Sequence, residues 1–282
     1  MEEGSKEKKN KKYKGKPKWY GSRQGKGRCS KAQKLAYKEV FPSISINKKY
    51  GEVINFREEF QIPDTHPGVC ILDIGFGMGD SLISTANMYK DKYILGCEIH
   101  RPGLANACLK VQEDQLKNVR LYGGDAFKFL SRHIAEGCQA FEQIMIFFPD
   151  PWKQDVDRRI IRTETINLFL KHMVHCADLF IATDISDYVD YIEKIMQPFI
   201  DSGLLQGGRC DRVNFRPVTK YEQIAIDEGR EVVDFHYICN NGDRKTDDMV
   251  ENQQGDKDAA TTTTTNNNEE EEEINNNKNN NK

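Results

Sequence analysis

The chain has 282 residues, of which 38% are hydrophobic and 30% are charged, and its formal net charge is −3. Its mean hydropathy of −0.71 is too polar for a chain that is globular from end to end. The sequence has no apolar run near the ~20 residues of a membrane helix, no signal peptide pattern and no C-x-x-C pair, which argues against a membrane protein, a secreted protein and a zinc knuckle.

The polarity is concentrated at the two ends of the chain. The first 28 residues contain eleven Lys and Arg against three Glu, and the C-terminal segment ends in runs of Thr, Asn and Glu. Neither segment has enough apolar residues to bury a core. The sequence therefore predicts a Lys-rich disordered tail over 1–20, a single domain over 21–240 and a second disordered tail over 241–282.

The predicted domain begins with a helix and continues with alternating strands and helices. The spacing of Ala32, Leu35, Ala36 and Val40 suits one helix face that closes before Pro42. After residue 67, strand-length apolar runs alternate with amphipathic stretches, which is typical of a parallel sheet with crossover helices. Strands are predicted at 69–74, 93–97, 119–122, 143–148 and 179–183, and two more at 204–214 and 231–239 are expected to form an antiparallel edge.

An acidic residue stands at or next to the carboxyl end of each of the first five predicted strands. These residues are Asp73, Glu98, Asp125, Asp150 and Asp184. In an open α/β sheet the carboxyl ends of the strands form the ligand crevice. Each residue alone could be an ordinary turn or helix cap, but five together favour one binding site.

The first predicted strand runs into the alternating glycines Gly75, Gly77 and Gly79. Such glycines let the backbone approach a ligand closely at the start of the following helix. A dinucleotide-binding pattern would place its third Gly at residue 80, where this chain has Asp80, and a carboxylate facing a pyrophosphate is unfavourable. The spacing instead resembles the first motif of class I S-adenosylmethionine-dependent methyltransferases, whose cofactor has no phosphate and carries positive groups.

Further acidic positions fit the same cofactor. Glu98, at the end of the second predicted strand, is placed to accept hydrogen bonds from two ribose hydroxyls. Asp125 and Ala126 would lie near the adenine. A glycine-rich turn alone has only moderate specificity, so the combination of these positions carries the prediction of S-adenosylmethionine.

The segment 147–152 reads F-F-P-D-P-W. The two prolines fix the backbone around Asp150 and exclude a helix, so the carboxylate and the Trp152 ring are held at the exit of the fourth strand. The string is either a rigid structural turn or a place where a planar base lies near the ring while the carboxylate addresses its polar edge.

Several strings together resemble, in order, the motifs of the bacterial-type tRNA (guanine-N7)-methyltransferases. They are 73–79, 98–103, 147–152, 182–184 and 216–222, and 23–28 resembles the basic entry segment of that family. The resemblance covers roughly residues 20–238. It implies an α/β, Rossmann-like class I methyltransferase fold, a mostly parallel seven-stranded sheet with helices on both faces and an antiparallel edge strand. It also implies methyl transfer from S-adenosylmethionine to N7 of a guanosine in the variable loop of tRNA.

By this resemblance, the cofactor is contacted by Asp73, Gly75, Gly77, Glu98, Asp125, Ala126 and Asp150, and the substrate by Lys153, Asp184, Thr219, Lys220, Tyr221 and Glu222. Asp150 is also the predicted catalytic residue. Guanine N7 has a free lone pair, so the reaction needs alignment and stabilisation of the developing positive charge rather than proton removal. Asp150 could supply that stabilisation, while Glu222 and Asp184 could hold the guanine N1 and amino donors.

The chain departs from the family after the P-D-P-W string, because 153–157 is shorter and more acidic. Lys153 is predicted to replace the family's substrate-contacting Lys. Phosphate contacts are expected from the N-terminal basic segment and from Arg158, Arg159, Arg162 and Lys220. No metal site is predicted, because the histidines have no metal-ligand spacing with Cys or carboxylates.

Several alternatives remain open. The Lys run over 6–18 is a solvated tail, an RNA-contacting arm or a nuclear-import signal. The protein is expected in the cytoplasm, or in the nucleus if the import signal acts. It is expected to modify tRNA alone, with a partner subunit as the alternative. The other two functions considered are a methyltransferase of another RNA or of protein, and a non-catalytic tRNA-binding subunit.

Overall fold

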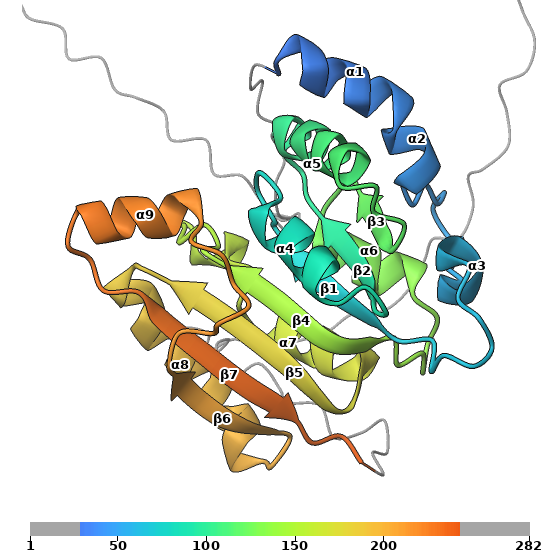
Figure 1. Cartoon of the computed structure of the whole chain (residues 1–282). Coiled ribbons are helices and arrows are strands. Elements are labelled where there is room, and N and C mark those ends of the chain that lie inside the picture. The colour runs from blue at the N-terminus through green and yellow to red at the C-terminus, as the bar shows by residue number, and fades with distance from the viewer. Residues whose placement is uncertain (1–28, 243–282) are drawn as a thin grey trace, which may run out of the picture. The chain divides into compact units, whose positions relative to one another are not determined.

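The computed structural model describes residues 29–242, and a seven-stranded sheet is the central element of this part of the chain (Figure 1). The strands are β1 (Cys70–Ile74), β2 (Tyr93–Cys97), β3 (Val119–Tyr122), β4 (Phe141–Phe147), β5 (Met173–Thr183), β6 (Leu205–Cys210) and β7 (Val233–Cys239). The helices are α1 (Lys31–Glu39), α2 (Phe41–Ile44), α3 (Phe56–Phe60), α4 (Asp80–Met88), α5 (Arg101–Glu113), α6 (Ala126–His133), α7 (Thr163–His172), α8 (Ser186–Asp201) and α9 (Lys220–Asp227), with a 3₁₀ turn, η1 (Val156–Arg158).

The order of the strands places a ligand crevice between β1 and β4. The sheet runs β3-β2-β1-β4-β5-β7-β6, so the chain moves outward from β1 through β2 to β3 and then returns to the other side of β1 with β4. Ligands of open α/β sheets bind beyond the carboxyl ends of the strands at such a reversal. The strands β1 to β5 pair in parallel, whereas β7 runs antiparallel to both β5 and β6.

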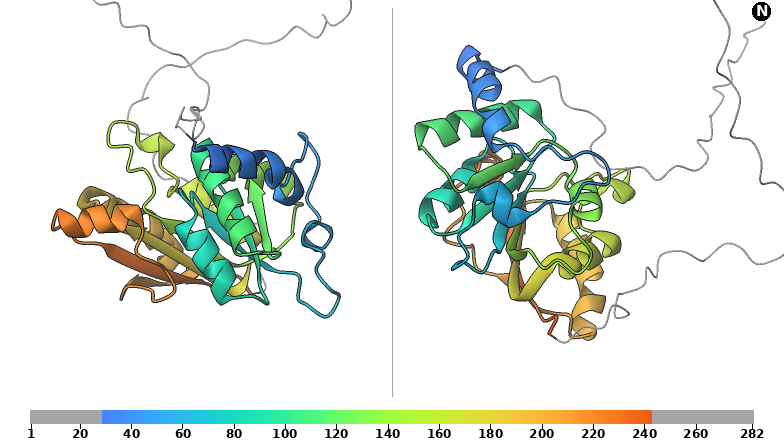
Figure 2. Two further views of the ribbon diagram at one scale, coloured as in Figure 1. Left: turned by 45° about the horizontal axis from the view of Figure 1, so that its top comes forward. Right: turned by 90° about the vertical axis from the view of Figure 1, so that its right-hand side faces the viewer.

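Helices cover both faces of the sheet, as predicted (Figure 2). All five residues of β1 are buried, because alternate side chains of a central parallel strand enter opposite layers. Ile71 packs in the layer that contains residues of α4 and α5. Cys70 and Leu72 pack in the layer with residues of α6, α7 and α8. Full burial of a side chain such as Ile71 contributes about 1.5–3 kcal/mol, and this continuous apolar pattern fixes β1 at the centre.

The predicted strands are confirmed, with differences at their ends. β1, β2 and β3 lie within one residue of prediction, but β5 begins at Met173, well before the predicted start at residue 179. Its pairing with β4 shifts register between Phe141 and Gln143, and Cys176 has a left-handed φ of 58°. The apolar pattern is broken at this bulge, so the early part of the strand carries no clear periodicity. The antiparallel pairing lies at the predicted edge, with β7 second and β6 outermost.

The predicted first helix is confirmed as α1. Ser30 and Gln33 form a reciprocal capping box at its start. Pro42 does not simply end the helical segment, because it stands in the first turn of α2, where its missing N–H is tolerated.

The predicted tails lie almost entirely outside the described residues, as does the basic segment at 23–28, and these remain predictions. Asn241, where the second tail was expected to begin, is buried, and its side-chain amide donates hydrogen bonds to the Leu170 and Met173 carbonyls at 3.1 and 2.7 Å. None of the helices within 29–242 has the length and apolar character needed to cross a membrane.

Candidate active site

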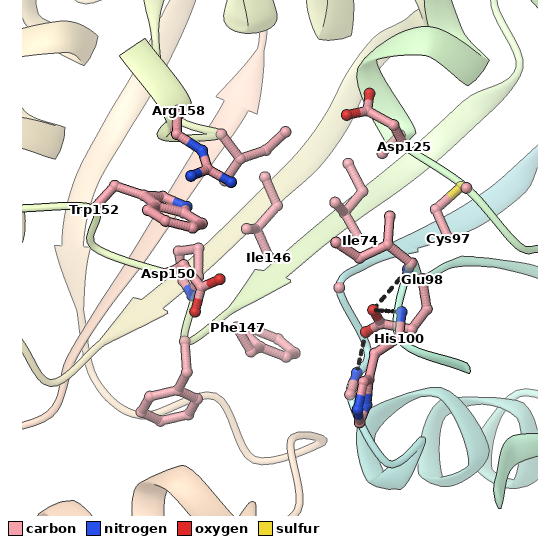
Figure 3. A pocket seen from close by; sticks show the side chains of 18 of the residues that line it. Ile74, Cys97, Glu98, His100, Asp125, Ile146, Phe147, Asp150, Trp152 and Arg158 are labelled. Carbon is pink, nitrogen blue, oxygen red and sulfur yellow. Dashed lines mark hydrogen bonds between the residues drawn. The ribbon is translucent and has the colours of Figure 1, made fainter. Parts of the chain in front are cut away.

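A cavity of about 400 Å³ lies at the carboxyl ends of the central strands (Figure 3). One wall comes from the glycine loop after β1 and from the ends of β2 and β3, and the facing wall comes from the segment that follows β4. Of the predicted site residues, the cavity is lined by Gly75, Gly77, Glu98, Asp125, Ala126, Asp150 and Tyr221. The prediction that acidic residues at strand ends meet at one edge is therefore confirmed for Glu98, Asp125 and Asp150.

The glycine loop is shaped by its own backbone and by the start of α5. Gly75 and Gly77 have left-handed φ values of 72° and 57°, and a Cβ at either position would meet no other atom within 4 Å. Both therefore present open backbone to the cavity. A Cβ on Gly103 would overlap the Gly77 carbonyl oxygen. Because Gly103 has no side chain, the start of α5 can pack directly against the backbone of the loop.

Glu98, which follows β2, is hydrogen-bonded to this loop. Its Oε2 accepts a 2.8 Å hydrogen bond from the Gly77 N–H, and its Oε1 accepts 2.7 Å bonds from the N–H groups of Ile99 and His100. Burial raises the pKa of this carboxyl, and the three backbone donors oppose the rise. Because Oε1 already accepts two bonds, the remaining acceptor capacity toward the cavity lies on Oε2. Glu98 can therefore accept fewer hydrogen bonds from ribose hydroxyls than the sequence predicts, since only one of its two oxygens is available.

Asp73 lies beneath the loop and does not line the cavity. It is 1% exposed, and its Oδ2 accepts a 2.7 Å hydrogen bond from the Ser81 hydroxyl at the start of α4. Burial raises the pKa of Asp73 to about 7, although the Ser81 hydrogen bond opposes the rise. The position supports the base of the loop rather than offering a carboxylate to a ligand in the cavity.

Asp125 lines the cavity at the start of α6. It is the N-cap of α6, and its Oδ1 accepts a 2.9 Å hydrogen bond from the Lys128 N–H. Its Oδ2 is buried and has no hydrogen-bond partner among the described residues. Burial also raises the pKa of this carboxyl. Leaving a buried acceptor unpaired is unfavourable by about 1–3 kcal/mol, and the contact of Asp125 with an adenine stays a prediction.

The opposite wall is a rigid turn that carries Asp150. Phe148 and Trp152, on either side of the P-D-P string, have left-handed φ values of 54° and 37°, which side-chain-bearing residues adopt only when their surroundings hold them. The Arg159 Nε donates a 2.7 Å hydrogen bond to the Pro151 carbonyl. Asp150, Trp152 and Phe147 all line the cavity on this side (Figure 3). The turn thus places an exposed carboxylate among aromatic side chains.

The arginines after this turn differ in their exposure. Arg158 lines the cavity, and its guanidinium carbon lies 3.5 Å from the centre of the Trp152 ring. Arg159 is 5% exposed and packs on the rings of Tyr188 and Tyr191. The expectation that Arg159 contacts phosphate was wrong, because its guanidinium is buried against protein.

The predicted substrate residues are divided between the surface and the interior. Tyr221 is 60% exposed and lines the cavity. Lys153 and Lys220 are exposed. Thr219 is the N-cap of α9, where its hydroxyl accepts a 3.2 Å hydrogen bond from the Glu222 N–H.

The two carboxylates that were expected to hold the guanine already have arginine partners. Asp184 forms an ion pair with Arg230. Glu222 is 2% exposed and accepts hydrogen bonds from Arg212 and Arg216. Burial opposes ionisation of Glu222, but the hydrogen bond from Arg212 and the two positive charges outweigh it and hold its pKa below the usual value. Neither side chain lines the cavity, so contact with the base stays a prediction that requires these arginines to release or share the carboxylates.

Sequence reasoning did not identify this arginine cluster as functional. Arg216 opens the string at 216–222, but its burial and its pairing with Asp234 on β7 depend on packing. The available signal was Asp234 inside the apolar strand run at 231–239, where a charged side chain must be paired.

Known proteins match this chain over most of its length. A family model described as putative methyltransferase matches residues 67–235, a range that contains every predicted cofactor and substrate residue. The tRNA (guanine-N(7)-)-methyltransferase of Legionella pneumophila (strain Paris) is 35% identical over 66% of this chain and 78% of that protein. The enzyme of the same name from Methylobacillus flagellatus is 32% identical over 74% of this chain and 86% of that protein.

A solved structure shares the fold. The crystal structure of the 16S rRNA methyltransferase KamB matches with a TM-score of 0.51 at 10% sequence identity, covering 70% of this chain and 98% of that chain. At this identity the likeness concerns the fold alone.

Proposed function

Because the chain belongs to the family of tRNA (guanine-N(7)-)-methyltransferases, we propose that it transfers the methyl group of S-adenosylmethionine to N7 of a guanosine in the variable loop of tRNA. The observation that carries this proposal is the facing arrangement of Asp125 and Asp150. The first offers a buried acceptor on one side of the cavity, and the second offers an exposed carboxylate among aromatic rings on the other.

The wall formed by the glycine loop and the ends of β2 and β3 suits the cofactor. Asp125 Oδ2 would accept from the adenine amino group, and Glu98 Oε2 from a ribose hydroxyl. The open backbone at Gly75 and Gly77 lets the rest of the cofactor approach closely. When bound, S-adenosylmethionine supplies a methyl group activated by a positively charged sulfur.

The wall formed by the turn after β4 suits the base. The rings of Phe147, Phe148 and Trp152 line the cavity, and planar bases stack on aromatic faces. Attack of the N7 lone pair on the methyl carbon would break the carbon–sulfur bond and leave the positive charge on the guanine. Asp150 stabilises the charge that develops on the base, and no proton has to be removed before transfer.

Basic side chains near the rim support binding of a polyanion. Arg158 lines the cavity, and Lys153 and Lys220 are exposed beside the predicted base site. On α1, Lys31, Lys34 and Lys38 are also exposed. We place the reaction in the cytoplasm and expect the chain to act on tRNA without a partner subunit.

The test is methyl transfer by the purified full chain to an unmodified tRNA transcript that carries a guanosine in its variable loop. With labelled S-adenosylmethionine, we expect 7-methylguanosine at that position after nucleoside analysis. The matched control is the same transcript with that guanosine replaced by adenosine, which should remain unlabelled. Label at another RNA position or on protein would favour a different methyltransferase. Cofactor and tRNA binding without transfer would favour a binding subunit.

A further inference from the structure

Arg216 is a fully buried arginine at the junction of three elements near the cavity. Its Nη1 donates a 2.6 Å hydrogen bond to Glu222 in the first turn of α9. Its Nη2 donates bonds of 2.7 and 3.0 Å to both carboxylate oxygens of Asp234 on β7. The guanidinium also lies 5.4 and 5.3 Å from the ring centres of Phe147 and Phe148, where β4 ends. A single side chain therefore contacts α9, β7 and the start of the Asp150 turn.

The charges around Arg216 are balanced. Glu222 and Asp234 are each 3% exposed at the side chain, and the first also accepts hydrogen bonds of 2.6 and 3.1 Å from Arg212. Two guanidinium groups thus face two carboxylates. Buried charges are tolerated only when they are paired in this way, and removing one partner leaves an uncompensated charge. These paired charges therefore link the elements that carry them.

The elements held by Arg216 form opposite parts of the substrate side of the cavity. Tyr221, adjacent to Glu222, lines the cavity from α9. Phe147 and Phe148 line it from the end of β4 and lead directly into Pro149 and Asp150. Arg216 itself does not line the cavity, so its effect on the reaction passes through these neighbours.

We propose that Arg216 is a positioning residue for methyl transfer, which sets the place of Asp150 relative to Tyr221 by joining α9, β7 and the end of β4 through one guanidinium group. This inference rests on the proposed function for its kinetic readout. Its structural content is that Asp150 and Tyr221 move independently when the link is lost.

The geometry requires arginine rather than any cation. The planar fork reaches Glu222 with one terminal nitrogen and Asp234 with the other, while its central carbon lies 5.4 and 5.3 Å from the two ring centres. A lysine keeps the charge but is a single flexible donor group that cannot reproduce this arrangement. Arg216→Lys therefore removes the link while conserving the charge balance.

The experiment compares the full-length parent with Arg216→Lys. The first measurement is calorimetric binding of S-adenosylhomocysteine, which counts folded cofactor sites. The second is the single-turnover rate of methyl transfer to saturating tRNA per cofactor site. We expect cofactor affinity within about 3-fold of the parent and a transfer rate lower by ~10- to 100-fold, because small misplacements of reacting groups have effects of this size. A purely structural role would reduce the number of folded sites and leave the rate per site unchanged, which would overturn the proposal.

The matched control is Arg209→Lys. Arg209 on β6 also forms a two-bond ion pair, with Glu193 at 2.6 and 3.0 Å, but it is exposed and does not line the cavity. Its rate per site should equal that of the parent.

If Arg216→Lys does not fold, Asp234→Asn serves as the second variant. It weakens only the β7 side of the link and should lower the rate per site by at least ~3-fold, whereas an unchanged rate would overturn the proposal.

Hydrogen–deuterium exchange gives a readout that is independent of activity. Arg216→Lys should increase exchange in both 147–152 and 219–224, and Arg209→Lys in neither. Unchanged exchange in either segment would overturn the inference even if the parent methylates tRNA. Conversely, a parent that transfers no methyl group to tRNA but shows this exchange pattern would reject the proposed function and leave the link intact.

Discussion

Gly77 and Glu98 lie 21 positions apart in the chain and are joined by a 2.8 Å hydrogen bond from the backbone N–H of the first to the carboxylate of the second. The bond makes the shape of the glycine loop depend on the same carboxylate that faces the predicted ribose position. Changes that displace the loop should therefore weaken cofactor binding even when they lie outside the cavity.

Gly103→Ala should displace the loop from behind. The added methyl group would overlap the Gly77 carbonyl oxygen, which is backbone and cannot rotate away. We expect a loss of about 1–3 kcal/mol in the free energy of unfolding and ~10-fold weaker binding of S-adenosylhomocysteine, measured by urea denaturation and calorimetry. Gly208→Ala is the control, because a Cβ at that position meets nothing within 4 Å. Equal cofactor affinity in the two variants would contradict the expectation.

Asp125→Asn should change which base the protein prefers in its cofactor. Asparagine keeps the N-cap bond to Lys128, so α6 is retained. A donor could then replace the buried Oδ2 acceptor that is proposed to accept from the adenine amino group. The parent should prefer S-adenosylhomocysteine over its inosine analogue by ~10- to 100-fold, and the variant should lose most of this preference. Calorimetry with both ligands measures the ratio, and an unchanged ratio would show that Asp125 does not read the amino group.

Asp150→Asn should slow the chemical step without affecting cofactor binding. The variant keeps the shape of the side chain but removes the negative charge beside the base. We expect the single-turnover rate to fall by ~10²- to 10³-fold, the range found when one electrostatic stabiliser is removed. Asp157→Asn, an exposed neighbour on η1, should remain close to the parent. Full activity of Asp150→Asn would remove Asp150 from the catalytic role.

Asp73→Asn should change how stability depends on pH. Burial raises the pKa of Asp73 from 3.8 to about 7, so the folded state binds this proton more tightly than the unfolded state. The stability of the parent relative to the variant should therefore fall as the pH rises from about 4 to about 7 and then become constant. The total change should be on the order of a few kcal/mol, measured by urea denaturation at several pH values.

A second substitution checks the cause of that slope. The Ser81 hydroxyl stabilises the charged form of Asp73, so Ser81→Ala should extend the pH-dependent range upward. A difference between the parent and Asp73→Asn that is the same at all pH values would show that the pKa of Asp73 is the same in the folded and unfolded states.

The central strands and the cofactor wall could be predicted because their signals are local. β1 is a short apolar run that ends in glycines, and Glu98 and Asp125 follow β2 and β3 closely. The start of β5 could not be predicted, because the left-handed Cys176 at its register shift interrupts the pattern.

The ion pairs formed by the predicted substrate carboxylates also could not be predicted from the sequence. Asp184 pairs with Arg230, and Glu222 with Arg212 and Arg216. The resemblance placed these acids at the substrate, but only packing determines which nearby guanidinium group reaches them. Ion pairing depends on three-dimensional proximity, for which spacing along the chain gives no rule.

The position of β7 has a consequence for the newly made chain. Because β7 hydrogen-bonds to β5 on one side and β6 on the other, β5 has an open backbone edge until Val233–Cys239 has been synthesised. The end of β5 is apolar and buried in the finished fold, so an incomplete chain would present an unpaired hydrophobic edge. Such edges promote association between chains, so fragments that stop before β7 should depend on chaperones to remain dispersed.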